Sequence, residues 1–196
     1  MNDVIYRTAT SLNGFIADEA NSLEWLFAVE HAGLPDESSF LERVGVLVMG
    51  STSYEWVMAH TEVLERPEQW REFYRERPSY VFTSRALPSP PGVDVRFVNA
   101  PVARALPDIR AAAGGRDVWV VGGGDLAGQF ADVGALDRIE LTVAPVALPG
   151  GAPLLPRRLE SDRLRLASVE RHGAFVDLVY TIDRADDPAP GRASPP

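Results

Sequence analysis

A turn of three consecutive glycines is the strongest candidate for a ligand site in this sequence. It lies within Val120–Ala127, which reads Val-Val-Gly-Gly-Gly-Asp-Leu-Ala. Because glycine has no Cβ atom, a ligand can approach the backbone closely. The helix expected after the turn offers unpaired N–H groups and the positive end of its dipole to a phosphate. The G-x-G-x-x-G spacing of the Rossmann fold is absent. The turn therefore indicates either an anion site or simply a tight turn. Asp125 can cap the helix that follows, but its carboxylate would disfavour an anion at this position.

Two other turns carry groups that bind phosphate. Gly50–Ser53 offers three hydroxyls, and Thr83–Arg85 offers two hydroxyls and a guanidinium, which can bind a phosphate through paired hydrogen bonds. In a parallel sheet the turns that follow the strands lie at one edge, where ligands bind. Each turn alone is commonly structural, but the three together predict a dinucleotide, whose separated phosphates can span several turns.

The composition excludes several classes of site. The chain has no cysteine, which excludes disulfides, thiolate nucleophiles and thiolate metal sites. It has no lysine, since all 19 basic residues are arginine, which excludes a Schiff base and a Walker-type phosphate loop. His31, His60 and His172 show no paired spacing, so we expect no metal site. The net charge of −9 provides no basic field for nucleic acid or an anionic membrane.

The length of the chain also limits what it can be. Its 196 residues suffice for one domain with a full hydrophobic core. No apolar stretch approaches the roughly 20 residues needed to cross a bilayer. Asp3 and Arg7 interrupt the region that a secretory signal would need. We therefore expect a cytoplasmic protein that acts on a small molecule.

The elements that must position these turns can be predicted from short apolar runs. Runs of this kind, each followed by a polar or glycine turn, are typical of a buried and largely parallel sheet. The expected strands are Val4–Thr10, Val44–Met49, Tyr80–Phe82 and Val118–Val121. The expected helices follow Ser51–Ser53, lie near 67–76 and 101–113, run through Phe130, and surround Phe40, where Asp36 is a candidate N-cap.

The pattern changes beyond residue 137. Apolar residues there alternate with polar or small ones, first in residues 139–143. Two further alternating runs, Leu164–Glu170 and Phe175–Ile182, predict an antiparallel hairpin. Residues 185–196 are rich in Asp, Ala and Pro with nothing to bury, so we expect a disordered tail.

The order of these motifs resembles that of the dihydrofolate-reductase-like superfamily. The chain is most similar to the branch that includes the C-terminal reductase domain of the bifunctional riboflavin-biosynthesis deaminase-reductase, over residues 3–183. The motifs that carry the resemblance are Ser11–Ala17, Val48–Glu55, Val81–Arg85, Val121–Gly124 and Leu141–Pro145.

The resemblance implies a fold and an assembly. We expect one α/β domain over residues 1–184 with a three-layer dihydrofolate-reductase-like fold. In that fold a mixed, mostly parallel sheet has helices on both faces and ends in a C-terminal antiparallel hairpin. The resemblance also implies a homodimer. Candidate aromatic residues for its surface, unless the core buries them, are Trp56, Trp70, Phe73 and Tyr74.

The resemblance further implies NADPH along the sheet edge, under a mobile lid formed by Asn13–Trp25. The glycine turn would hold the pyrophosphate. The turn at Gly50–Ser53 would hold the adenine-side phosphates, and the turn at Thr83–Arg85 would hold the adenosine 2′-phosphate. The implied cofactor-binding residues are Ala9, Ile16 and Ala17 beside the nicotinamide, and Gly50, Ser51, Ser53, Thr83, Ser84, Arg85, Gly122, Gly123, Gly124, Asp125 and Leu126 along the dinucleotide. Relatives usually have an arginine where this chain has Ser51. Arg85 is then left to bind the 2′-phosphate, and NADH is not excluded.

Hydride transfer needs the nicotinamide and the acceptor held together in a dry pocket, with an acid or an ordered water to supply a proton. Asn13, Asp36 and Glu37 are the candidate catalytic residues, although Asp36 can equally be a helix cap. The candidate substrate-binding residues are Trp25, Val121 and Thr142.

Three functions remain open. The first is reduction of a substrate like that of the riboflavin pathway, 5-amino-6-(5-phosphoribosylamino)uracil, whose phosphate would need a cation such as Arg7, Arg157 or Arg158. No zinc-deaminase motif accompanies it. The second is reduction of dihydrofolate or another pterin-like or carbonyl compound. The third is a nucleotide-binding module without catalysis, since a fold alone does not determine a function.

Overall fold

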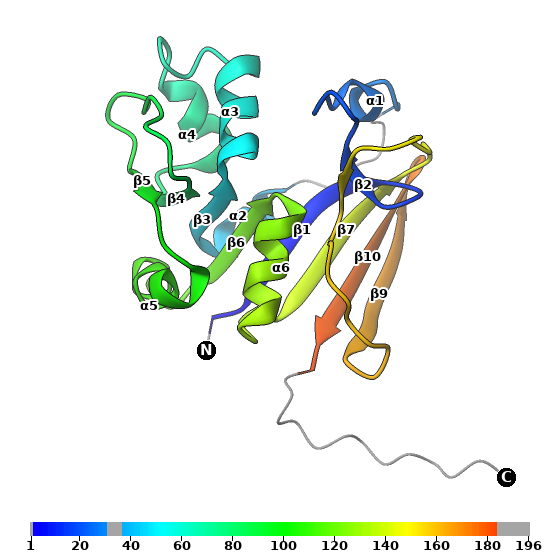
Figure 1. Cartoon of the computed structure of the whole chain (residues 1–196). Coiled ribbons are helices and arrows are strands. Elements are labelled where there is room, and N and C mark those ends of the chain that lie inside the picture. The colour runs from blue at the N-terminus through cyan, green and yellow to red at the C-terminus, as the bar shows by residue number, and fades with distance from the viewer. Residues whose placement is uncertain (1, 31–36, 184–196) are drawn as a thin grey trace, which may run out of the picture.

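The computed structural model describes residues 2–30 and 37–183. Its main sheet has eight strands in the order β5–β4–β3–β6–β1–β7–β10–β9 (Figure 1). The strands from β5 to β7 in that order are parallel, and β10 runs antiparallel to both β7 and β9. The bounds are β1 Val4–Ser11, β3 Val44–Gly50, β4 Ser79–Phe82, β5 Val95–Val98, β6 Asp117–Gly122, β7 Arg138–Ala144, β9 Leu164–His172 and β10 Phe175–Ile182. A small second sheet pairs β2 (Phe15–Ala17) with β8 (Ala152–Pro153).

Helices cover both faces of the parallel part of the sheet. One face packs on α5 (Val102–Ala112) and α6 (Gly124–Asp132), and the other on α2 (Ser38–Arg43), α3 (Ser51–His60) and α4 (Glu68–Tyr74). A short helix, α1 (Glu24–Phe27), lies close to α3.

The packing of strand β3 explains why its sequence is an unbroken run of apolar residues. Because side chains alternate between the faces of a strand, Val46 and Val48 pack in the cluster of α5 and α6, whereas Leu47 and Met49 pack in that of α3 and α4. All four side chains are fully buried. Burial on two faces leaves no position for a polar residue. The predicted three-layer α/β fold is confirmed.

The hairpin of β9 and β10 forms the end of the sheet away from α3 and α4 (Figure 1). Most of β9 is exposed, including Leu166 and Val169. Strand β10, in contrast, is buried or half-buried along its whole length. The predicted hairpin is confirmed.

Several short elements were absent from the sequence-based expectation. Strand β5 is an edge strand whose central residues, Arg96 and Phe97, are exposed, so it lacks the apolar run of the other strands. Strands β2 and β8 have three and two residues, and α1 has four. Segments of this length carry too few residues for a periodic pattern. The helix expected to follow Ser51–Ser53 begins earlier, because Gly50 is its N-cap and Ser51 already belongs to α3.

The aromatic residues suggested for a dimer surface mostly face inward. Trp70 is fully buried against Tyr54 and Tyr74, and Trp56 and Tyr74 line the pocket described below, so only Phe73 of the four remains largely exposed. Asp36 and the predicted tail at 185–196 lie outside the described residues. Within residues 2–30 and 37–183, no helix is long and apolar enough to span a membrane.

Candidate cofactor and substrate site

A pocket of about 510 Å³ opens at the carboxyl ends of β1 and β6, between α3, α6 and the segment that holds α1. Its volume lies in the usual range for small-molecule sites. The sequence-predicted residues that line it are Ala9, Ile16, Ala17, Ser53, Val121, Gly122, Gly123, Gly124 and Asp125. Most of its other walls are apolar side chains from α1, α3, α4 and β6. The pocket therefore lies beside two of the three turns that predicted a ligand, the glycine turn and the turn that ends at Ser53.

The glycine turn forms one end of this pocket, and its glycines have different roles. Strand β6 ends at Gly122, and α6 begins at Gly124. A Cβ atom at Gly124 would lie 2.3 Å from the carbonyl oxygens of Pro153 and Leu154, so this glycine is required by packing. A Cβ atom at Gly123 would meet nothing closer than Ile16 Cδ1, at 4.0 Å across the pocket. The open space at Gly123 is thus available to a ligand.

Asp125, in the first turn of α6, does not present a free carboxylate to the pocket. It accepts hydrogen bonds from Gln129 Nε2 and Arg157 Nη2, each at 2.9 Å. These contacts, the one from Gln129 first, lower the pKa of Asp125. Arg157 also contacts Asp132 at 2.9 Å. The positive charge of Arg157 offsets the negative charge of Asp125. The carboxylate therefore repels an anion at the start of α6 less strongly than an unpaired carboxylate would.

The turn at Gly50–Ser53 contributes to the pocket the start of α3 and only some of its hydroxyl groups. Thr52 and Ser53 of α3 line the pocket, whereas Gly50 and Ser51 do not. Ser53 Oγ lies 3.0 Å from where a Cβ atom at Gly122 would stand, so the starts of α3 and of the glycine turn lie close together. Two helix N-termini therefore border the same pocket.

The third turn lies outside the pocket wall. Thr83, Ser84 and Arg85 do not line the cavity. The Arg85 backbone N–H donates to Thr83 Oγ1 at 3.0 Å. The Arg85 guanidinium donates to both carboxylate oxygens of Glu55 on α3, at 2.9 and 2.5 Å. The arginine that was expected to bind a 2′-phosphate is thus already in a two-point ion pair.

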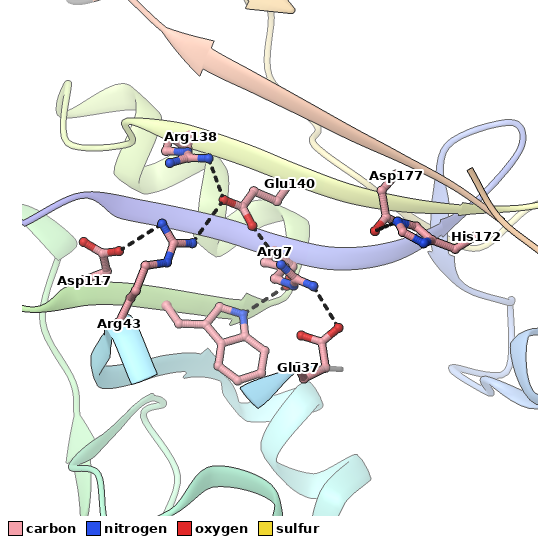
Figure 2. A network of polar contacts seen from close by, with 9 residues as sticks. Arg7, Glu37, Arg43, Asp117, Arg138, Glu140, His172 and Asp177 are labelled. Atoms are coloured by element: carbon pink, nitrogen blue, oxygen red, sulfur yellow. Dashed lines mark hydrogen bonds and ion pairs between the residues drawn. The ribbon is translucent and has the colours of Figure 1, made fainter. Parts of the chain in front are cut away.

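A second part of the pocket, the Arg7 end, carries a cation that was one of several candidates in the sequence. Arg7, on β1, lines the pocket and belongs to a network of polar contacts (Figure 2). Its Nη1 contacts Glu140 Oε2 at 2.9 Å, and its Nη2 contacts Glu37 Oε1 at 2.8 Å. The guanidinium also lies 4.3 Å from the centre of the Phe40 ring. These contacts hold Arg7 in one orientation.

Glu140, on β7, is the buried centre of this network. Its side chain is only 6% exposed and also contacts Arg138 at 3.0 Å and Arg43 at 3.8 Å. Arg43 in turn lies 3.8 Å from Asp117. Three guanidinium groups therefore surround one buried carboxylate.

An aromatic wall also lines the pocket, and sequence reasoning did not assign it to the site. It consists of Trp56, Tyr74 and Trp119. Trp119 Nε1 donates to the Arg7 carbonyl oxygen at 3.1 Å, and Trp56 stacks on His60 with ring centres 4.2 Å apart. Their spacing in the sequence is that of ordinary core residues, so no sequence signal could have identified them.

Several predicted site residues have other positions. Asn13 is not in the pocket: its amide donates to the Leu148 carbonyl at 2.7 Å, and its Oδ1 accepts from the Leu148 N–H at 3.0 Å. Both ends of the side chain therefore join the β1–β2 turn to the loop after β7, a structural role. Leu126 is buried in the core because it lies on the inner face of α6.

Four candidates remain to be placed. Trp25 belongs to α1, but it is not among the residues that line the pocket. Thr142 pairs with Ala9 in the sheet, one strand away from the pocket. Glu37 reaches the site through Arg7, and Asp36 lies outside the described residues. The described ranges contain no group of three or more His, Asp or Glu side chains that could hold a metal ion.

Known proteins are similar to this chain in sequence and in fold. Residues 2–176 match the family described as the RibD C-terminal domain. The uncharacterized protein YwjB of Bacillus subtilis is 33% identical over 172 residues, which cover 88% of this chain and 93% of that protein. The uncharacterized protein YyaP of the same organism is 25% identical over 183 residues, which cover 90% and 93% of the two chains.

Two solved structures extend the comparison. A putative riboflavin biosynthesis protein from Shewanella sp. PV-4 superimposes with a TM-score of 0.74 at 25% identity, covering 94% of this chain and all of that one. A deaminase/5-amino-6-(5-phosphoribosylamino)uracil reductase from Thermotoga maritima gives a TM-score of 0.61 at 17% identity, and the match covers 93% of this chain but 57% of that chain. The second likeness shows the fold alone. The family match over nearly the whole chain shows that this protein belongs to the RibD C-terminal domain family.

Proposed function

We propose that this protein is an NADPH-dependent reductase that transfers a hydride to a small heterocyclic or carbonyl substrate. The first candidate is 5-amino-6-(5-phosphoribosylamino)uracil, the compound named for the Thermotoga protein. The observation that carries the proposal is the single pocket that joins the glycine turn, the starts of α3 and α6, and the Arg7 network. Membership of a family that includes riboflavin-pathway reductases supports the same chemistry.

The residues at the glycine turn fit a dinucleotide. Gly123 leaves space at the start of α6, and Thr52 and Ser53 present hydroxyls at the start of α3. Two helix N-termini with their positive dipole ends favour the pyrophosphate. Ala9, Ile16 and Ala17 offer small and apolar surfaces on which a nicotinamide ring can lie.

A bound reduced nicotinamide supplies the hydride. The protein supplies a dry environment, since the walls contributed by Leu23, Leu26, Trp56 and Val121 are apolar. Exclusion of water strengthens the electrostatic contacts that the acceptor makes with the protein. The pocket thus provides orientation and desolvation, and the chemistry is that of the cofactor.

Arg7 provides the positive charge on the substrate side. Its Nη1 is held by the buried Glu140, whereas its Nη2 contacts Glu37, whose side chain is 53% exposed. A phosphate, carboxylate or carbonyl oxygen of the substrate can replace Glu37 at Nη2 without exposing Glu140. Arginine stays protonated in proteins, so Arg7 orients the acceptor and stabilises negative charge. The proton comes from an ordered water.

The proposal is tested first by binding. Trp56 and Trp119 line the pocket, so NADPH and NADH titrations can be followed by quenching of tryptophan fluorescence. We expect micromolar binding of NADPH, followed by NADPH oxidation when the uracil substrate is added. Binding without turnover on that substrate, on dihydrofolate or on simple carbonyl compounds would favour a non-catalytic binding module. Failure to bind either dinucleotide would overturn the reductase.

We also propose that the protein is a homodimer. Phe73, Leu166 and Val169 are large apolar side chains that remain more than half exposed in the single chain. Light scattering coupled to size exclusion should give twice the mass of the 21.4 kDa chain. A monomer at micromolar concentration would contradict this proposal and leave the reductase proposal unaffected.

A further inference from the structure

Two arginines lie outside the pocket wall, near the starts of α3 and α6, and a carboxylate holds each of them. Arg157 contacts Asp125 at the start of α6. Arg85 donates both terminal nitrogens to Glu55, and these side chains are 54% and 42% exposed. The two pairs differ in position along the sheet edge, and this difference has consequences for which dinucleotide binds.

The order of the strands places Arg85 beyond the glycine turn. Along the carboxyl edge, β1, β6, β3 and β4 follow one another. Ala9 lies on β1, the glycine turn follows β6, and Thr52 follows β3. Because Gly50 pairs with Phe82, the Arg85 turn is the next position outward from the start of α3. Neighbouring strands are about 4.8 Å apart, so the four positions span about 14 Å, a distance suited to a dinucleotide.

A dinucleotide with its nicotinamide at Ala9 and its pyrophosphate at the glycine turn would bring its adenosine end to α3 and the Arg85 turn. NADPH and NADH differ only in the 2′-phosphate of that adenosine. Arg85 presents a planar fork that matches a phosphate, but Glu55 occupies both arms of the fork. A 2′-phosphate that binds these nitrogens must displace Glu55, and one that binds the remaining N–H groups of Arg85 lies near the negative charge of Glu55.

We infer that Glu55 determines the cofactor specificity of this reductase by competing with the adenosine 2′-phosphate for Arg85. The competition weakens NADPH binding and leaves NADH binding unchanged, so the natural protein discriminates poorly between the two. Asp125 acts differently, since it lies beside the pyrophosphate that both dinucleotides share. This inference rests on the proposed function, because it assumes that a nicotinamide dinucleotide occupies the pocket.

The test compares three neutralising substitutions by their dissociation constants for NADPH and NADH, measured from tryptophan quenching. Glu55→Gln should tighten NADPH about threefold to tenfold and change NADH by less than twofold, the range expected for modest electrostatic competition at the surface. Asp125→Asn should shift both constants by the same factor. Asp162→Asn serves as the control for net charge, because this exposed residue precedes β9 at the opposite edge of the sheet, and it should change neither constant.

A fragment experiment isolates the adenosine end. Adenosine 2′,5′-bisphosphate and adenosine 5′-monophosphate differ by the 2′-phosphate alone and do not need the nicotinamide side of the pocket. Glu55→Gln should strengthen binding of the bisphosphate only, and Arg85→Gln should remove any preference for it. Thermal melting of each variant would show that the fold is retained.

The possible outcomes separate the two proposals. If both dinucleotides bind and Glu55→Gln leaves their ratio unchanged, the inference about Glu55 is wrong and the reductase proposal stands. If Glu55→Gln tightens both equally, Glu55 acts only through general charge, and the inference is again overturned. If neither dinucleotide binds any variant, the proposed function fails together with this inference.

Discussion

The two ends of the pocket hold their charged groups in different ways. Near the glycine-turn end, but outside the pocket wall, Arg85 and Arg157 form ion pairs with carboxylates whose side chains are 42% and 66% exposed. At the Arg7 end, the central carboxylate, Glu140, is 6% exposed. Exposed ion pairs contribute about 0–1 kcal/mol, whereas removing one partner of a buried pair costs about 3–5 kcal/mol. A ligand can therefore compete for the exposed arginines, but it cannot separate Arg7 from Glu140 at an acceptable cost.

This difference suggests a division of roles. The Arg7 end keeps a rigid arrangement, as expected where an acceptor must be oriented for reaction. The glycine-turn end has charges that can rearrange around a cofactor that enters and leaves. The substitutions below test this contrast, beginning with the largest expected effect.

Glu140→Ala should have the largest effect. It would leave Arg7, Arg43 and Arg138 without their shared buried partner, so we expect the free energy of unfolding to fall by about 3–4 kcal/mol. Urea denaturation measures this change. The matched control is Glu160→Ala, which removes an exposed partner of Arg158 and should cost less than about 1 kcal/mol. Equal effects of the two substitutions would mean that the Arg7 end is no more rigid than the other.

The next comparison lies within the glycine turn. Gly124→Ala places a Cβ atom against the carbonyls of Pro153 and Leu154 and should lower the free energy of unfolding by about 1–3 kcal/mol. Gly123→Ala instead fills space in the pocket and should chiefly weaken both dinucleotides, by about tenfold or about 1.4 kcal/mol. Denaturation and fluorescence titration of both variants separate the effects. If Gly123→Ala did not alter binding, the turn would not contact the cofactor.

Asn13→Ala tests whether this residue is structural. Loss of its two hydrogen bonds to the Leu148 backbone should cost about 1–2 kcal/mol of stability. The turnover number of the folded variant should change little. Asn13→Asp keeps an acceptor for the Leu148 N–H but lacks the donor, so its stability should lie between those of Asn13→Ala and the natural protein. A large fall in turnover with unchanged stability would return Asn13 to the catalytic residues.

The smallest effect concerns acid stability at the glycine-turn end. Hydrogen bonds from Gln129 and Arg157 lower the pKa of Asp125 in the folded protein. This ionised carboxylate therefore stabilises the fold above its unfolded pKa of about 4, and the contribution is lost as the pH falls through the lower folded value. Because the residue is exposed, Asp125→Asn should cost less than about 1 kcal/mol at neutral pH. The deficit should begin to shrink below about pH 4 and disappear below the folded pKa, as melting temperatures over a pH series would show, and a deficit that persisted in acid would have another cause.

Much of the fold could be predicted from the sequence because its signals are local. The apolar runs at β1, β3, β4 and β6 need only the burial of both sheet faces, and the alternation in β9 and β10 is typical of antiparallel strands. The glycine turn was recognisable because close backbone approach requires a particular residue type at adjacent positions. Nine of the predicted cofactor and substrate residues accordingly line the pocket.

The partners of the charged residues could not be predicted in this way. Arg7 and Glu140 are 133 positions apart, and Arg85 and Glu55 are 30 apart. Nothing in the types of these residues selects one partner among the 28 acidic side chains of the chain. The aromatic wall is hidden for a similar reason, since Trp56 and Trp119 look like any other apolar residue of a helix or a strand.

The sequence by itself determined which segments become buried strands and where the backbone can approach a ligand, because hydrophobic periodicity and the absence of a Cβ atom act locally. Only the tertiary structure decided which arginine is fixed and which can exchange its partner. That distinction depends on how deeply each carboxylate is buried, and burial follows from the packing of segments that are far apart along the chain.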